Sequence, residues 1–224
     1  MSSHHIVRDK QEPALLIANG EACSEELLGQ LLEWSPYVVV LDRAAHRVLD
    51  LDIKIDVLLG DFDGAFDPQE ILARQYPLEI VHTPDQNKTD LEKGIEFLIQ
   101  RGFPAVNIVW ATGRRADHTI ANLTNIVRYK DQIKIVLLDD YSKVFPLRGT
   151  FEKWYTAATP ISLIPVGTVT GITTEGLKYN LSDDVLVLGQ RSGNSNEVLR
   201  DGFVRITAQT GDLLIMECWD QVWV

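Results

Sequence analysis

The first 145 residues alternate short apolar runs with amphipathic stretches. The apolar runs are five or six residues long, and several are rich in valine and isoleucine, as in strands covered on both faces. They occupy Ala14–Ala18, Tyr37–Leu41, Ile55–Leu59, Leu78–His82, Val106–Ala111 and Lys134–Leu138. Helical patterns lie between them at Ser24–Trp34, Asp90–Arg101 and His118–Lys130. This alternation predicts a three-layer α/β domain, with a parallel sheet between two layers of helices.

The pattern changes near Phe145, where helical spacing stops and glycine-rich turns begin. Short strands are predicted at Lys153–Ala157, Ile161–Pro165, Val185–Leu188, Phe203–Ala208 and Leu213–Cys218. Such spacing is typical of an antiparallel β-sandwich. We therefore expect a catalytic α/β domain over residues 1–147 and a β-sandwich domain over residues 148–224.

Composition excludes some partners. A net charge of −11 argues against binding to nucleic acid, and no apolar run is long enough to cross a membrane. No targeting segment is evident, and the two cysteines, Cys23 and Cys218, lack the spacing of a metal or redox site. A reducing, cytoplasmic location is therefore expected.

Aspartates follow four consecutive predicted strands. Ligands collect at the carboxyl ends of the strands in an open parallel sheet, so this is where an active site is expected. Asp42 follows one strand, and the Gly60–Gly64 turn, which holds Asp61 and Asp63, follows the next. The segments Thr83–Asp90 and Thr112–His118 follow the other two and add basic residues.

Asp61 and Asp63 are predicted to bind Mg²⁺. They stand two residues apart in a segment that leaves a strand, so extended geometry points both carboxylates to one side. A hard cation offsets their repulsion and keeps its other positions for water and phosphate. The alternative is an ordinary surface turn, in which aspartate and glycine are common.

Thr89 and Asp90 begin the helix predicted to end near Gly102. Thr89 and Glu92 have the spacing of a capping box, so capping alone explains Thr89. A helix N-terminus at the carboxyl edge of a sheet also suits phosphate, which leaves a second role open for Asp90. Lys88 is an ordinary surface lysine unless this site is real.

The loop before the third helix carries Arg114, Arg115, Asp117 and His118. An arginine can neutralise charge on a transferring phosphate, and Asp117 could orient or deprotonate a nucleophile. Asp117 is also a natural helix cap, and His118 is more simply an early helical residue. The sequence contains neither a P-loop nor a dinucleotide fingerprint, so phosphate binding would rest on metal, helix ends and arginine.

Five segments, in order, resemble those of the thiamine pyrophosphokinase family. They are Gly60–Gly64, Gln86–Asp90, Arg114–His118, Gly176–Tyr179 and Ser195–Glu197. The resemblance extends over about residues 14–217, nearly the whole chain. It implies a homodimeric enzyme that transfers pyrophosphate from ATP to thiamine with Mg²⁺, releasing AMP.

The resemblance also implies roles for individual residues. Asp61, Asp63 and Asp90 would hold Mg²⁺, and with Arg115 and Asp117 they would form the catalytic set. ATP would be bound by Asp42, Gln86, Lys88, Thr89 and Arg115. Asp117 would lie near the hydroxyl of thiamine, with Ser195 and Asn196 in a thiamine pocket at the dimer interface. Aromatic candidates for contact with thiamine are Tyr179, Trp154, Trp219 and Trp223, each of which could equally belong to the core.

Some positions depart from the family pattern. The segment Asp42–His46 lacks the two glycines that usually follow the first acidic strand end. Asn87 replaces an aspartate, Arg114 stands where glycine is common, and Gly64 replaces serine. None of these changes removes a carboxylate from the predicted site.

Two other functions fit parts of the pattern. Asp61–Gly64 resembles the signature of haloacid-dehalogenase-type phosphatases, and the Asp139–Asp140 pair could supply their late acidic residues. That motif normally lies on the first strand, whereas here it follows the third. The other possibility is a module that binds a nucleotide or a thiamine compound without turnover.

Overall fold

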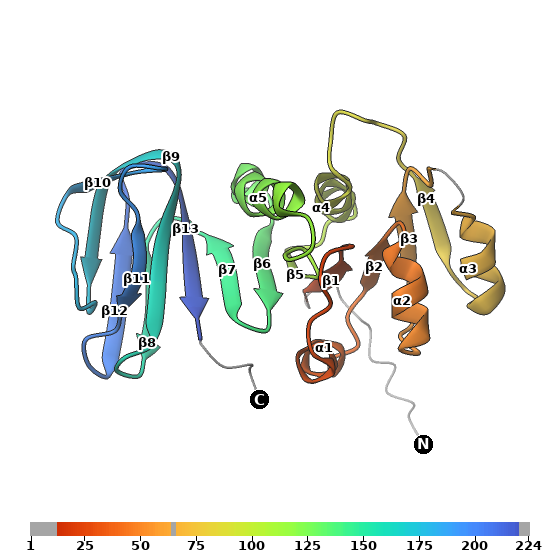
Figure 1. Cartoon of the computed structure of the whole chain (residues 1–224), viewed down its shortest axis with the longest axis horizontal. Coiled ribbons are helices and arrows are strands. Elements are labelled where there is room, and N and C mark those ends of the chain that lie inside the picture. The colour runs from red at the N-terminus through yellow and green to blue at the C-terminus, as the bar shows by residue number, and fades with distance from the viewer. Residues whose placement is uncertain (1–12, 64–65, 220–224) are drawn as a thin grey trace, which may run out of the picture.

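The computed structural model describes residues 13–63 and 66–219. Six parallel strands form the sheet of the N-terminal part, in the order β4-β3-β2-β1-β5-β6 (Figure 1). Their bounds are β1 Ala14–Ile17, β2 Val38–Leu41, β3 Val57–Gly60, β4 Glu79–His82, β5 Ala105–Val109 and β6 Lys134–Asp139. The predicted α/β architecture is confirmed.

Helices cover both faces of this sheet. One face packs against α4 (Asp90–Gln100) and the short 3-10 helix η1 (Ile126–Tyr129), which follows α5 (Ala116–Asn125). The other face packs against α1 (Glu25–Leu32), α2 (Ala44–Asp50) and α3 (Pro68–Arg74). Successive strand residues enter opposite cores, because side chains alternate across a strand. Leu15 and Ile17 face the α1 side, whereas Leu16 faces α4.

Helix α4 packs closely on the sheet at Gly94. A Cβ added there would lie 2.9 Å from Leu16 Cδ1, so a side chain would force the Leu16 side chain or the helix to shift. Its capping box is present as predicted, with the Thr89 hydroxyl accepting from the Glu92 amide at 3.3 Å. This packing fixes the start of α4 at the carboxyl edge of the sheet.

Short elements were not predicted. Helices α2 and α3 contain seven residues each, which is too few for two clear repeats of a helical pattern. The predicted helix His118–Lys130 is shorter than expected, because its last turn adopts the tighter geometry of η1. Helix α3 nevertheless has a readable start, with Asp67 as N-cap and Pro68 in the first turn.

The remaining strands are antiparallel and enclose a separate apolar core. They are β7 Ser142–Pro146, β8 Phe151–Tyr155, β9 Pro160–Glu175, β10 Asp184–Val187, β11 Gly193–Glu197, β12 Gly202–Thr207 and β13 Thr210–Cys218. The long strand β9 pairs with β11 and β13 along its first part and with β10 and β12 further on. It thereby connects the two layers of the predicted sandwich.

Strand β7 joins the two parts. It pairs antiparallel with β6 on one side and with β13 on the other, so the hydrogen-bonded sheet continues from one part into the next (Figure 1). Val144 of β7 and Leu214 of β13 both enter the core beneath α4. The domain boundary at residue 147 stays a prediction. Over the described ranges, no helix is long and apolar enough to cross a membrane.

Candidate active site

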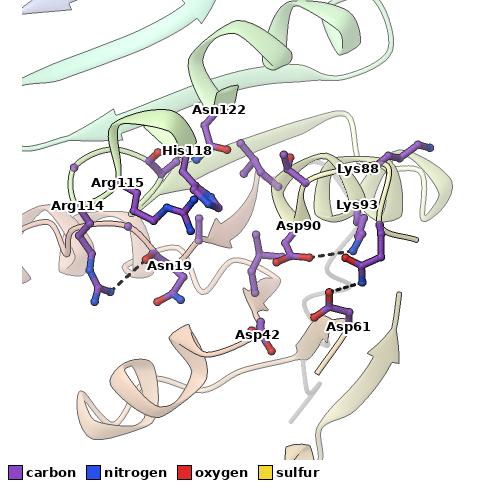
Figure 2. Close-up of a pocket in the computed structure, with 18 residues that line it drawn as sticks. Asn19, Asp42, Asp61, Lys88, Asp90, Lys93, Arg114, Arg115, His118 and Asn122 are labelled. Atoms are coloured by element: carbon purple, nitrogen blue, oxygen red, sulfur yellow. Dashed lines mark hydrogen bonds and ion pairs between the residues drawn. The ribbon is translucent and has the colours of Figure 1, made fainter. Parts of the chain in front are cut away.

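A cleft of about 440 Å³ opens at the carboxyl edge of the parallel sheet (Figure 2). The starts of α4 and α5 border it, as expected for ligand sites in open α/β sheets. Its lining residues are Ala18, Asn19, Gly20, Leu41, Asp42, Asp61, Gln86, Lys88, Thr89, Asp90, Leu91, Lys93, Ala111, Gly113, Arg114, Arg115, His118 and Asn122. The segments that follow four predicted strands do converge.

The backbone around the cleft is strained. Asp42, Phe62, Trp110 and Arg114 have φ values of 41°, 55°, 56° and 53°, in the left-handed region that side chains other than glycine rarely adopt. All four residues lie just beyond the carboxyl end of a strand or in the loop that follows. Strain of this kind persists where the surrounding structure fixes a functional geometry.

Asp42 is the most unusual carboxylate in the cleft. Its side chain is 17% exposed, and its Oδ1 is buried without a hydrogen-bond partner among the described residues. Burial raises the pKa of Asp42, and the negative charges of Asp90 and Asp61 raise it further. A buried, partnerless oxygen next to two other carboxylates is a good ligand for a cation.

Asp61 is held in place by Gln86. The Gln86 amide donates to Asp61 Oδ2 at 3.0 Å, and this hydrogen bond is the main reason that the pKa of Asp61 is lowered. Asp63 does not line the cleft, although its amide donates to Asp61 Oδ1 at 3.4 Å. The Asp63 carbonyl accepts from Arg43 at 3.3 Å. Gly64, at the end of the predicted turn, lies outside the described residues.

The start of α4 places charged groups at the cleft. Asp90 Oδ1 accepts from Lys93 Nζ at 3.2 Å, and the Lys93 side chain is only 6% exposed. Lys88 lines the cleft, with its Nζ at 2.8 Å from both carboxylate oxygens of Glu96. Lys93 was not predicted, although its position one helical turn after Asp90 was a usable signal.

The loop after β5 supplies the opposite charge. Figure 2 shows Arg114 and Arg115 across the cleft from the aspartates. Arg115 binds both oxygens of Asp117, at 3.1 Å and 2.5 Å, and this pairing lowers the pKa of Asp117 to about 2. Arg114 donates to the Asn19 carbonyl at 3.4 Å. Asp117 itself does not line the cleft, whereas His118 does.

The loop after β1 also belongs to the site and was missed. A Cβ on Gly20 would lie 2.4 Å from the carbonyl oxygens of Trp110 and Thr112, so this loop packs backbone to backbone. Arg47 of α2 donates to the Gly20 carbonyl at 2.9 Å and stacks over the Trp110 ring at 4.3 Å. No charged residue in Ala18–Gly20 drew attention to the segment.

The residues predicted for thiamine lie in the C-terminal part, away from the cleft. Asn196 of β11 is 8% exposed, and its side chain joins the backbone of Tyr179 by two hydrogen bonds, at 2.8 Å and 3.1 Å. Ser195 has a φ of 56°, and its amide donates to Ser162 Oγ at 3.0 Å.

The aromatic candidates differ in their surroundings. Tyr179 and Trp154 are 64% and 50% exposed, so they do not belong to the core. The Trp219 indole donates to the Asp140 carbonyl at 2.6 Å. Trp223 lies outside the described residues.

The acidic pair expected for a phosphatase has structural roles. Asp140 accepts from the amide and hydroxyl of Ser24 at the start of α1, at 2.9 Å and 2.6 Å. Asp139 accepts from the Thr112 hydroxyl at 2.8 Å. Neither carboxylate lines the cleft, which removes support for the phosphatase alternative.

Within residues 13–63 and 66–219, no group of three or more histidine, cysteine or acidic side chains is arranged so that it could already hold a metal ion. Nevertheless, the carboxylates of Asp42, Asp61 and Asp90 surround one part of the cleft (Figure 2). The partnerless Oδ1 of Asp42 is an oxygen donor of the kind that a hard cation binds.

Fold and site together define an α/β protein with an acidic cleft that faces two arginines across the carboxyl edge of its sheet. The chain matches the model "Thiamin pyrophosphokinase, catalytic domain" over residues 28–137 and "Thiamin pyrophosphokinase, vitamin B1 binding domain" over residues 151–213. It belongs to the thiamine pyrophosphokinase family, a family of transferases.

Individual relatives support this family assignment. Thiamine pyrophosphokinase 1 of Oryza sativa subsp. japonica is 31% identical over 77% of this chain and 75% of the relative. The Bacillus subtilis thiamine pyrophosphokinase is 27% identical over 71% of this chain and 77% of its own. In solved structures the fold recurs in the Bacillus subtilis enzyme, with a TM-score of 0.79, 23% identity and coverage of 93% and 100%. The yeast enzyme has a TM-score of 0.78, 16% identity and coverage of 95% and 88%.

Proposed function

We propose that this protein transfers the pyrophosphoryl group of ATP to the hydroxyl of thiamine, giving thiamine diphosphate and AMP. Family membership supports the reaction class. The observation that carries the proposal is the cleft itself, where Asp42, Asp61 and Asp90 lie across from Arg114 and Arg115. This arrangement suits a polyphosphate whose charge is shared between metal and arginine.

Asp42, Asp61 and Asp90 would hold Mg²⁺. The metal would neutralise phosphate charge as the leaving AMP departs. Gln86 keeps the Asp61 carboxylate oriented and ionised through its hydrogen bond. Asp63, also predicted to bind metal, orients this turn through its backbone, and its side chain remains a candidate ligand once ATP is bound.

Cationic side chains would position the phosphates. Arg115 is the main candidate, because it lines the cleft and is 72% exposed. Lys88 and the amide groups at the start of α4 would contact the same polyphosphate, with Thr89 fixing that helix end. In-line transfer then depends on positioning and electrostatics and needs no covalent intermediate.

Asp117 would orient the thiamine hydroxyl rather than deprotonate it. A pKa of about 2 makes its carboxylate a weak base at neutral pH. Both of its oxygens accept from Arg115, but the side chain is 64% exposed and each oxygen keeps a second lone pair for the hydroxyl. Arg115 would then contact Asp117 and the phosphates together, which couples acceptor binding to donor binding.

Ser195 and Asn196 lie in the C-terminal part and do not line the cleft. We therefore propose a homodimer in which a second copy brings its β-sandwich surface, including exposed Tyr179, to the ATP cleft. A monomeric mass in solution during turnover would contradict this assembly. The free thiol of Cys23 supports a cytoplasmic location.

Incubation with MgATP and thiamine, followed by chromatography, tests the proposal. We expect AMP and thiamine diphosphate in equal amounts, with both lost when thiamine is omitted or EDTA is added. AMP without thiamine diphosphate would overturn the acceptor. Binding of both compounds without any AMP would favour the non-catalytic binding module.

A further inference from the structure

A second cavity, of about 340 Å³, lies apart from the ATP cleft and shares no residue with it. It is bordered by the beginning of β6 and by β7, β8 and β13. The cleft lies at the carboxyl ends of the parallel strands, whereas Lys134 in this cavity is the first residue of β6. A ligand here would be remote from the proposed chemistry.

The cavity is basic in an acidic protein. Lys134, Lys143, Arg148 and Lys153 line it, and Glu217 is the only acidic side chain among the described residues of its lining. The whole chain, by contrast, has a net charge of −11. Four cations around one carboxylate make a local field that attracts anions.

Glu217 is paired with Lys153, and its single negative charge leaves the four cations in excess. Its carboxylate is 8% exposed and accepts from Lys153 Nζ at 2.9 Å on each oxygen, and from the Tyr155 hydroxyl at 2.6 Å. Lys143 is the direct cross-strand neighbour of Glu217. Even so, Lys143 forms no ion pair with any residue that the structure describes.

Lys143 is half-buried and has no ion-pair partner among the described residues. Burial is the main cause that lowers the pKa of Lys143; the charge of Glu217 raises it, and the charges of Lys153 and Lys134 lower it. A bound anion would replace lost hydration and offset this repulsion. Arg148 and Lys134 are exposed beside it, and neither forms an ion pair within the described ranges.

Part of the lining is apolar and aromatic. Phe145 and Phe151 both line the cavity, with ring centroids 5.3 Å apart and planes tilted by 40°. Val136 and Leu147 continue this surface. The volume lies within the range of small-molecule sites, in which apolar walls carry a few fixed polar groups.

We propose that this cavity binds a small organic anion, with a flat apolar body against Phe145 and Phe151 and an anionic group on Lys143. Arg148 and Lys134 assist at the rim. A phosphate, sulfonate or carboxylate supplies the same contact, so the site selects a class of compound. Its distance from the cleft makes it a second ligand site, independent of the proposed reaction.

Titration with anilinonaphthalene sulfonate, an aromatic anion whose fluorescence rises in apolar sites, tests the proposal. We expect saturable binding that weakens about tenfold in Lys143→Met, as when a charge-assisted contact is lost. Lys143→Arg should retain binding, and Arg148→Met should weaken it with no effect on folding. Lys54→Met, at an exposed lysine paired with Asp56, should bind as the unchanged protein does.

Arg115→Met tests whether the dye enters the ATP cleft instead. Loss of binding in Arg115→Met, with unchanged affinity in Lys143→Met and Arg148→Met, would overturn the proposal. Binding that never saturates would overturn it as well. Thermal melts of each variant show whether a loss reflects unfolding, and in that case Arg148→Met decides the outcome.

Discussion

Replacing Asp42 by asparagine should make the free protein more stable while removing its activity. The Asp42 carboxylate is mostly buried, its Oδ1 has no partner among the described residues, and Asp61 and Asp90 repel it. Asparagine keeps the shape and removes the charge. Arg43 Nε lies 3.8 Å from Asp42 Oδ2 and offsets only part of this cost, so relief of the buried charge should contribute about 1 kcal/mol to stability. In a chain of 224 residues, that raises Tm by about 2–4 °C.

In the presence of MgATP, the unchanged protein should be more stable than Asp42→Asn. A ligand at a hundred times its Kd stabilises the folded state by about 2.7 kcal/mol, so the unchanged protein should gain several degrees. Asp42→Asn should gain much less, because a ligand of the metal is lost. Differential scanning fluorimetry with and without MgATP measures both effects, and Asp131→Asn, at an exposed loop carboxylate, is the matched control.

The stability difference should also depend on pH. Because folding raises the pKa of Asp42 above its ordinary 3.8, the folded state binds this proton more readily than the unfolded state does. The unfavourable contribution is complete above the folded pKa and fades as the pH falls toward 3.8. The gap in Tm should therefore shrink in acid. An Asp42→Asn variant that melts below the unchanged protein at neutral pH, or gains equally from MgATP, would refute this reasoning.

Three further predictions concern other parts of the molecule. If Asp63 becomes a metal ligand once ATP is bound, Asp63→Asn should lower kcat by about a hundredfold or more, with little change in Tm; near-normal turnover would show that Asp63 does not join the three cleft aspartates as a metal ligand. Asn196→Ala should cost about 1–3 kcal/mol, because the Tyr179 backbone loses both partners, as a urea titration would show. Gly211→Ala should cost at least about 1 kcal/mol, since its φ is 88° and a Cβ would lie 2.3 Å from the Thr168 carbonyl oxygen; an unchanged urea midpoint would contradict that.

Sequence patterns located much of the site, because strand ends in a parallel sheet meet at one edge. Asp42, Asp61 and Asp90 could be placed together from this rule alone. Helix capping was equally local, and the Thr89 capping box is confirmed. The family resemblance, resting on five ordered motifs, is confirmed by the comparisons.

Contacts between distant segments could not be predicted. Asp140 accepts from Ser24, the N-cap of α1, which lies 116 residues away. The Asp139–Asp140 pair, which could have supplied the late acidic residues of a phosphatase, therefore has a structural role. Lys93 is buried because α4 packs closely on the sheet at Gly94. A single glycine in the helical pattern was not enough to predict this close packing. Glu217 of β13 accepts from Lys153 of β8, a contact that depends on how the two strands are placed in the folded chain.

The roles of Asp117, Ser195 and Asn196 remain predictions for a different reason. Asp117 is tied to Arg115 in the free protein, and the other two lie outside the cleft. Each would act only once a ligand or a second copy completes the site. A single unliganded chain holds no contact that tests them.

The fate of the γ-phosphorus of ATP tests the proposed reaction most directly. ATP labelled at that position is incubated with Mg²⁺ and thiamine, and the products are separated. Transfer of pyrophosphate places the label in thiamine diphosphate and leaves AMP unlabelled. Labelled thiamine monophosphate with ADP, or labelled free phosphate as the main product, would contradict pyrophosphoryl transfer.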